Sequence, residues 1–302
     1  MDQDRECHGL RLLSVGRPGE ERPAVLLDDG KALDLACLRP SFFSSWRRIF
    51  AGGALGEVRA VLASGDWPAA AIVDPERAGW APPIPDPGKV ICLGRNYQAH
   101  ADEQGVAAPE APLLFPKVRT ALIGQGAPIE LPDPAIEDRV DYEAELAVVI
   151  GRRARRVSEA EAMACVAGYT ILNDVTGRRT QRAEKQWLRA KGFDSFGPCG
   201  PWIVTPEAIP DPHALAIECR VNGELRQSSH TGLMIFRIPF LISYLSQTMT
   251  LEPGDIISTG TPAGVGEARQ PPVFLQAGDV VRCTIAGIGT LENPVRAGAQ
   301  VQ

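Results

Sequence analysis

The sequence has few residues of the kinds that build soft-metal sites or disulfide frameworks. Its 302 residues include only four histidines and seven cysteines. The histidines, at positions 8, 100, 213 and 230, are far apart in the sequence, and no Cys-x-x-Cys pair occurs. This pattern argues against a zinc site made of histidine and cysteine ligands. An odd number of dispersed cysteines is typical of reduced thiols, so we expect a cytoplasmic protein.

Long hydrophobic runs and a basic surface are also missing. The apolar stretch at 235–245 is interrupted by Arg237, and residues 1–6 lack the basic and apolar regions of a signal peptide. The formal net charge is -6, which argues against nucleic-acid binding because phosphate contacts need a basic face. The short basic run at 152–156 is interpreted as a solvated strand end or turn. We therefore expect a small-molecule partner, with no nucleic acid and no membrane.

What the chain does contain is enough apolar sequence for a sizeable core. It is 44% hydrophobic and 23% charged, and its length predicts about two domains. Four prolines fall within residues 81–88, where neither a helix nor a central strand tolerates them. We interpret this segment as a linker between a small N-terminal α+β domain (residues 1–80) and a larger domain (residues 86–302) that is rich in β structure.

Several local patterns predict elements of the larger domain. Buried strands are expected at 89–93, 143–150 and 169–172, from short apolar runs that end at glycine or polar residues. The sequence Ser158-Glu-Ala-Glu161 fits a helix capping box. The dipeptide Asn222-Gly223 predicts a tight hairpin, because it favours positive φ at both central residues.

The most informative segment is Asp141-Tyr-Glu143-Ala-Glu145. Residues two apart on a strand share a face, so Glu143 and Glu145 point the same way, with Asp141 beside them and Ala147 and Val149 continuing into the core. A solvated edge strand is the alternative. Asp174, at the end of a second strand, adds a third carboxylate. Three oxygen ligands without nitrogen or sulfur suit a hard cation, with Mg²⁺ first and Mn²⁺ or Ca²⁺ as alternatives.

At this point the sequence resembles the fumarylacetoacetate hydrolase family. The resemblance runs from about residue 89 to residue 295 and is carried in order by five segments: residues 89–100, 141–146, 173–175, 191–198 and 251–266. It implies a mixed β-roll catalytic domain, a homodimer, and Mg²⁺ or Mn²⁺ held by Glu143, Glu145 and Asp174. One departure is Arg179, which stands where the family often has aspartate and could change the charge around the pocket.

The resemblance also implies roles for individual residues. His100 and Glu103 are three apart and would share a face of a helical turn, so Glu103 could orient His100 as a general base. A lone histidine is more often structural, and the family position favours the catalytic interpretation. Lys191 would stabilise an oxyanion, where the default for a lysine is a solvated surface position. The residues expected to contact the substrate are Arg178, Gln181, Thr261 and Tyr97.

The run 259–266 is not a phosphate loop, since it lacks the Gly-Lys-Ser/Thr ending and a following helix. Either it is a plain turn, or its amides and Thr261 hold the substrate carboxylate. Our preferred function is hydrolysis of a carbon–carbon bond in acylpyruvates or related 2,4-diketo acids, through an enolate stabilised by the metal. The alternatives are an oxaloacetate decarboxylase, an isomerase or hydratase of a 2-oxo dicarboxylate, and a non-catalytic, metal-stabilised binding protein.

Overall fold

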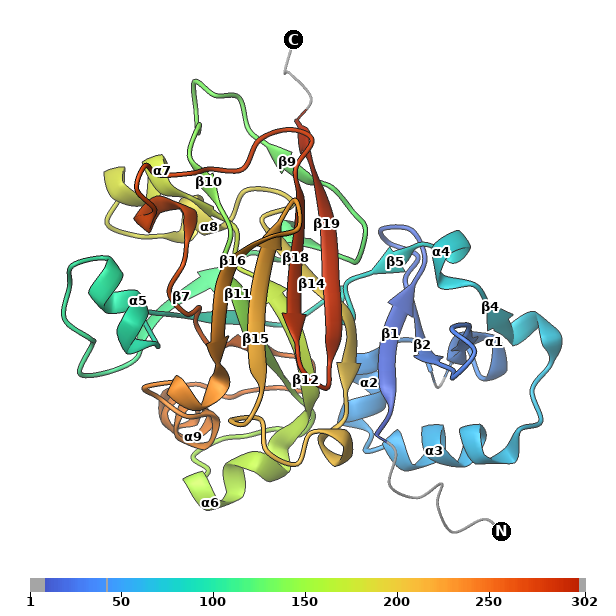
Figure 1. Ribbon diagram of the computed structural model, residues 1–302. Helices are drawn as coiled ribbons and strands as arrows, with labels where there is room; N and C mark the ends of the chain where they lie inside the picture. Colours follow the sequence, from blue (N-terminus) through green and yellow to red (C-terminus); the bar gives the residue numbers. More distant parts are fainter. Residues whose placement is uncertain (1–8, 42, 299–302) are drawn as a thin grey trace.

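The structure is a computed structural model that describes residues 9–41 and 43–298 (Figure 1). Its strands form three sheets, of twelve, five and two strands. The main path of the large sheet runs β4-β3-β2-β1-β14-β12-β11-β17-β6-β7, with β5 paired to β1 and β8 paired to β14. The five-stranded sheet has the order β16-β15-β18-β19-β9, and β10 pairs with β13. The chain is thus α+β with mixed sheets and short helices, as the sequence predicted.

The elements have the following bounds. The strands of the large sheet are β1 (Arg11–Val15), β2 (Arg22–Leu26), β3 (Ala32–Asp34), β4 (Ile72–Val73), β5 (Trp80–Ala81), β6 (Val90–Gly94), β7 (Leu113–Lys117), β8 (Leu122–Ile123), β11 (Ala144–Ile150), β12 (Val166–Asn173), β14 (Gly197–Val204) and β17 (Ile256–Ser258). Those of the smaller sheets are β9 (Ile129–Leu131), β10 (Val140–Asp141), β13 (Thr176–Gly177), β15 (Ala216–Val221), β16 (Glu224–His230), β18 (Val280–Ile285) and β19 (Gly289–Ala297). The α-helices are α1 (Leu35–Leu38), α2 (Trp46–Ala51), α3 (Leu55–Ser64), α4 (Pro75–Ala78), α5 (Gln98–Glu103), α6 (Glu159–Ala162), α7 (Arg178–Ala183), α8 (Leu188–Lys191) and α9 (Ile238–Thr248).

The N-terminal strands continue the large sheet. Strand β1 pairs antiparallel with β14, with Leu12 opposite Ile203. The proline-rich segment joins β5 to β6, the strand predicted to open the larger domain. In Figure 1 the N-terminal elements lie on the right, and α5, α7 and α8 lie on the left. The division into domains of residues 1–80 and 86–302 stays a prediction.

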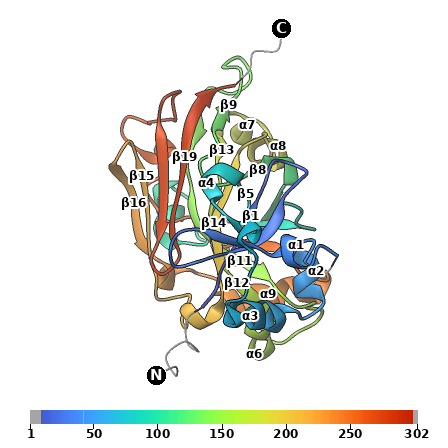
Figure 2. The same cartoon turned by 90° about the vertical axis from the view of Figure 1, so that its right-hand side faces the viewer.

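Strand β11 is buried on both faces, which fixes the position of the site. Its residues Leu146, Val148 and Ile150 belong to a core shared with the five-stranded sheet. The alternate residues Ala147 and Val149 belong to a second core that includes N-terminal side chains. Figure 2 shows the five-stranded sheet as a separate layer beside β11, β12 and β14. A strand enclosed in this way can hold side chains at its beginning with little freedom to move.

Two local predictions are confirmed. Asn222 and Gly223 have φ values of 54° and 81° and connect β15 to β16 as a tight hairpin. Ser158 and Glu161 form the capping box at the start of α6, with the Ser158 amide donating to Glu161 Oε2 at 2.9 Å. The cysteines that the structure describes are all free thiols, and Cys7 lies outside the described residues. Among the described residues, no helix has the length and apolar character needed to cross a membrane.

Candidate active site

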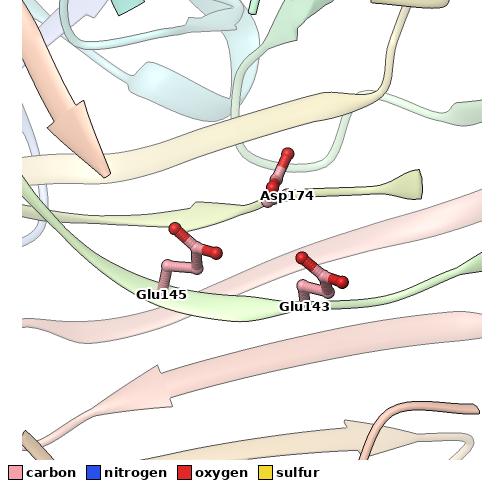
Figure 3. Close-up of side chains that lie close together, drawn as sticks. All are labelled: Glu143, Glu145 and Asp174. Atoms are coloured by element: carbon pink, nitrogen blue, oxygen red, sulfur yellow. The ribbon is translucent and has the colours of Figure 1, made fainter. Parts of the chain in front are cut away.

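Three buried carboxylates meet where β11 begins and β12 ends. Glu143 precedes β11, Glu145 is its second residue, and Asp174 directly follows β12. The antiparallel register places Ala144 opposite Asn173, and the Asp174 amide donates to the Glu143 carbonyl at 2.8 Å. One oxygen from each carboxylate lies within 4.8 Å of the others. Figure 3 shows both glutamates on one side of β11, facing the strand end that carries Asp174.

Two buried lysines offset part of the negative charge of this cluster. Lys191, at the end of α8, places Nζ 2.8 Å from Glu143 Oε2 and 2.5 Å from Asp174 Oδ2. Lys117, at the end of β7, places Nζ 2.6 Å from Asp174 Oδ1 and 3.1 Å from the Val175 carbonyl. Both side chains are almost completely buried. Lys191 was predicted from the sequence as a site residue and Lys117 was not, because a strand pattern does not tell which lysine is buried.

The two glutamates differ in their electrostatic surroundings. Burial, together with the nearby charges of Asp174 and Glu143, raises the pKa of Glu145 well above its usual value. Burial acts in the same direction on Glu143, but the positive charges of Lys191 and Arg178 outweigh it and lower its pKa. A carboxylate with a raised pKa gains most from a new positive charge beside it.

Glu145 has a free oxygen in a place where a cation would fit. Its Oε2 accepts from the Ser258 hydroxyl and from the Gly260 amide at 3.0 Å. Its Oε1 is buried and has no partner among the described residues. Since an unpaired buried polar atom is costly, and every ligand offered is an oxygen, the cluster fits a hard divalent cation held by Glu143, Glu145 and Asp174.

His100 and Glu103 form the expected pair on α5. The Nδ1 atom of His100 lies 2.6 Å from Glu103 Oε1, and His100 is 3% exposed. The second oxygen of Glu103 accepts from the Gly264 amide at 2.8 Å. The other ring nitrogen, Nε2, faces Gln104 Nε2 at 3.1 Å. With Nδ1 donating its hydrogen to Glu103, Nε2 carries the lone pair that a general base needs.

Arg178 is a buried anchor of the pocket wall. Its guanidinium is 2.9 Å from Asp141 Oδ2 and 2.7 Å from Glu143 Oε1, and Nη1 donates to Gln181 at 2.9 Å. Asp141, expected beside the two glutamates, shares the Arg178 Nη2 atom with Glu143 and also accepts from the amides of Gly266 and Glu267 at 2.7 and 2.9 Å.

The glycine-rich loop uses several of its amides inside the protein. Those of Gly260, Gly264 and Gly266 donate to Glu145, Glu103 and Asp141. The Thr261 hydroxyl donates to the Ala144 carbonyl at 2.9 Å, although the residue still lines the pocket. These three amides therefore hold the site's own carboxylates.

Two other residues that the sequence assigned to the pocket, Tyr97 and Arg179, do not line the pocket that contains His100. Tyr97 is buried, and its hydroxyl has no partner among the described residues. Arg179, expected to change the pocket charge, pairs with Asp138 at 2.6 Å and donates to backbone carbonyls of a neighbouring loop. It does not line the pocket that contains His100.

One pocket joins these groups. His100, Glu143, Arg178, Gln181, Lys191 and Thr261 all line it, so the structure brings together most of the residues singled out from the sequence. It also adds Arg95, Gln104, Phe115 and Trp187, which the sequence analysis did not assign to the site. Arg95 and Gln104 flank the motif residues Tyr97 and His100, and that proximity was the one signal that could have identified them.

Comparisons with known proteins support an enzyme. A mitochondrial oxaloacetate tautomerase of Xenopus laevis is 44% identical over 293 residues, covering 95% of this chain and 90% of that protein. The crystal structure of a 5-carboxymethyl-2-hydroxymuconate delta-isomerase from Mycobacterium smegmatis is 39% identical, with a TM-score of 0.72 and coverage of 96% and 100% of the two chains. That of a maleylpyruvate hydrolase from Sphingobium sp. SYK-6, solved with manganese(II) and pyruvate, is 31% identical, with a TM-score of 0.78 and the same coverage.

These relatives contradict the expectation of a cytoplasmic protein. The names of the similar tautomerases from Xenopus laevis and Rattus norvegicus place those proteins in mitochondria. Dispersed thiols argue only for a reducing environment, so they could not distinguish the cytoplasm from another reducing compartment. The expectation is therefore wrong.

The family assignment rests on the larger part of the chain. The model of the fumarylacetoacetate (FAA) hydrolase C-terminal family matches residues 89–296. This range contains the carboxylate cluster, both lysines and the His100–Glu103 pair. The chain thus belongs to the fumarylacetoacetate hydrolase family and is an enzyme of that family.

Proposed function

We propose that this enzyme interconverts the keto and enol forms of oxaloacetate or of a closely related 2-oxo dicarboxylate. One observation carries the proposal: a single proton-carrying pair, His100 with Glu103, opens onto the same pocket as the carboxylate cluster and Lys191. Such a pocket can remove a proton next to a carbonyl and stabilise the resulting enolate. The similarity to an oxaloacetate tautomerase along 95% of the chain supports this choice.

The reaction needs only the movement of one proton. In the keto form, His100 Nε2 removes a proton from C3; the C2–C3 double bond forms as the negative charge moves to the oxygen on C2. The imidazolium then returns a proton to that oxygen, which gives the enol and restores the neutral ring. Glu103 stabilises the imidazolium between these steps. No water is consumed and no carbon–carbon bond breaks.

Other residues would hold the substrate and its developing charge. A divalent cation on Glu143, Glu145 and Asp174 would polarise the 2-oxo group as a Lewis acid. Lys191 would place its ammonium near the oxygen on C2, and Arg178 would keep Glu143 oriented. Gln181 and Thr261 line the same pocket and are proposed substrate contacts. Tyr97, which is buried close enough to Glu145 to feel its charge, is proposed as a further contact of the same kind.

Hydrolysis of an acylpyruvate is the second candidate. The same His100–Glu103 pair could activate water, and a structural relative that is 31% identical is named as a maleylpyruvate hydrolase. We rank it second because relatives from Xenopus laevis and Rattus norvegicus, which are 44% and 41% identical over 95% and 96% of this chain, are named as oxaloacetate tautomerases. Oxaloacetate decarboxylation ranks third, since it needs the cation but does not require a general base such as His100.

The test follows three reactions in parallel. Freshly dissolved enol-oxaloacetate is added to Mg²⁺-loaded protein; the keto form is measured with a coupled dehydrogenase, and pyruvate release reports decarboxylation. Acetylpyruvate serves as the hydrolysis substrate. We expect the enol to be converted faster than in a Mg²⁺ blank, with little pyruvate from either substrate. Conversion at the blank rate, together with rapid acetylpyruvate cleavage, would make the hydrolase the correct assignment.

We also propose that the protein forms a homodimer, as the family resemblance implies. Light scattering of the purified chain measures this directly, and the mass of a single 32.4 kDa chain at micromolar concentration would refute it.

A further inference from the structure

Arg95 stands in an unusual backbone position at the entrance of the pocket. It lies between β6 and α5 and has φ 57°, a left-handed conformation that residues other than glycine rarely adopt. Such strain persists where the surrounding structure or a functional side chain requires it. Arg95 lines the pocket that contains His100 and Lys191, and it also lines an adjoining outer pocket with Glu103, Arg182 and Glu267.

The guanidinium of Arg95 has no ion-pair partner among the described residues. Its Nε donates to Gln104 Oε1 at 2.9 Å, and its guanidinium lies 5.9 Å from the centre of the Trp187 ring. Gln104 and Trp187 are the side chains that contact it among the described residues, and no carboxylate there pairs with it. Its Nη atoms are therefore free to bind an anion, while Trp187 supports the plane of the guanidinium.

The other cations of the two pockets are already paired. Arg178 binds Asp141 and Glu143. Lys191 binds Glu143 and Asp174. Arg182 is mostly exposed and binds Glu267 at 2.9 Å. Among the described residues that line the two pockets, Arg95 is thus the cation that has no carboxylate partner.

We propose that Arg95 binds the distal carboxylate of the substrate and gives the enzyme its preference for 2-oxo dicarboxylates over 2-oxo acids without a second charge. This inference rests on the proposed function, because it assumes that the 2-oxo acid end sits at the carboxylate cluster. A guanidinium can grip a carboxylate with two parallel hydrogen bonds, which a neutral ester cannot accept as strongly.

The proposal also explains how Gln104 is arranged. Its Oε1 accepts from Arg95, and its Nε2 faces His100 Nε2 at 3.1 Å. The distal carboxylate and the proton-accepting nitrogen are therefore linked by one short chain of side chains. If Arg95 holds the distal carboxylate of a dicarboxylate, C3 of that substrate would lie between Arg95 and His100, within reach of the imidazole.

The experiment compares oxaloacetate with its 4-methyl ester, which lacks only the distal charge. Wild-type holoenzyme should have a higher kcat/KM for the diacid. Arg95→Gln should lower kcat/KM for the diacid roughly 10- to 100-fold, as expected for losing charged hydrogen bonds, and change that for the ester less than about twofold. Arg95→Lys should recover part of the loss. Arg182→Gln, the matched control, should leave the acid-to-ester ratio unchanged.

Several results would overturn the inference. Equal kcat/KM for acid and ester in the wild type would do so without any variant, even if Arg95→Gln failed to fold. Equal losses on both substrates in a folded Arg95→Gln would do so as well. If the wild type did not accelerate tautomerisation at all, the proposed function would fail separately. Calorimetric titration of Mg²⁺-loaded protein with oxaloacetate and with its 4-methyl ester would then decide whether Arg95 binds the distal carboxylate.

Discussion

Replacing Lys117 by methionine tests the electrostatic balance of the cluster. The change removes an ammonium 2.6 Å from Asp174 and keeps a stem of similar length in a fully buried position. Removing one member of a buried ion pair costs about 3–5 kcal/mol. We expect the lower end, about 3 kcal/mol in the metal-free protein, because Lys191 still contacts the other oxygen of Asp174. For a chain of 302 residues that lowers Tm by roughly 5 °C.

Magnesium should reverse part of that loss. A bound cation replaces the missing positive charge beside Asp174, so saturating Mg²⁺ should raise Tm more in Lys117→Met than in the wild type. Differential scanning calorimetry with chelator and with Mg²⁺ measures both effects, and Lys31→Met, at an exposed position, serves as the control. A Lys117→Met variant within about 0.5 kcal/mol of the wild type, with equal Mg²⁺ responses, would refute this reasoning.

Three further outcomes follow from the described contacts. Glu145→Gln should weaken Mg²⁺ binding at least tenfold while the protein remains folded, as measured by calorimetric titration; unchanged affinity would remove Glu145 from the ligand set. Gly223→Ala, at φ 81° in the hairpin, should lower the free energy of unfolding by about 1–2 kcal/mol without changing kcat, and a neutral result in denaturant titration would contradict the strained turn. Ser158→Ala should cost about 1 kcal/mol by loss of the capping box, in the same titration, whereas Ser64→Ala should cost less.

Much of the site could be predicted because its signals are local. The two-residue period of a strand places Glu143 and Glu145 on one face, and the end of a neighbouring strand brings in Asp174. The spacing of His100 and Glu103 on one helical turn predicts their contact. In each case the residues are close in sequence or lie on strands that pair directly.

Features that depend on distant packing could not be predicted in the same way. Lys117 can be recognised as a site residue only from the fold, which places the end of β7 next to Asp174. Asp141 follows the strand pattern but is not part of the cluster of Glu143, Glu145 and Asp174, and it binds Arg178, which is 37 positions away. The pairing of β1 with β14 likewise joins segments on either side of the proline-rich stretch, which the sequence predicted to be a linker between domains. The type of reaction could not be predicted from local sequence patterns either, since one base and one cation would serve hydrolysis and tautomerisation equally well.

The most direct test of the account is hydrogen exchange at C3 of oxaloacetate in D₂O, followed by proton NMR. We predict that the Mg²⁺-loaded wild type exchanges the C3 protons much faster than a Mg²⁺ blank, without matching pyruvate formation. His100→Ala should slow the enzymatic exchange by roughly 10²- to 10⁴-fold, the usual contribution of a general base. Exchange at the blank rate in the wild type, or an undiminished rate in His100→Ala, would contradict the central claim.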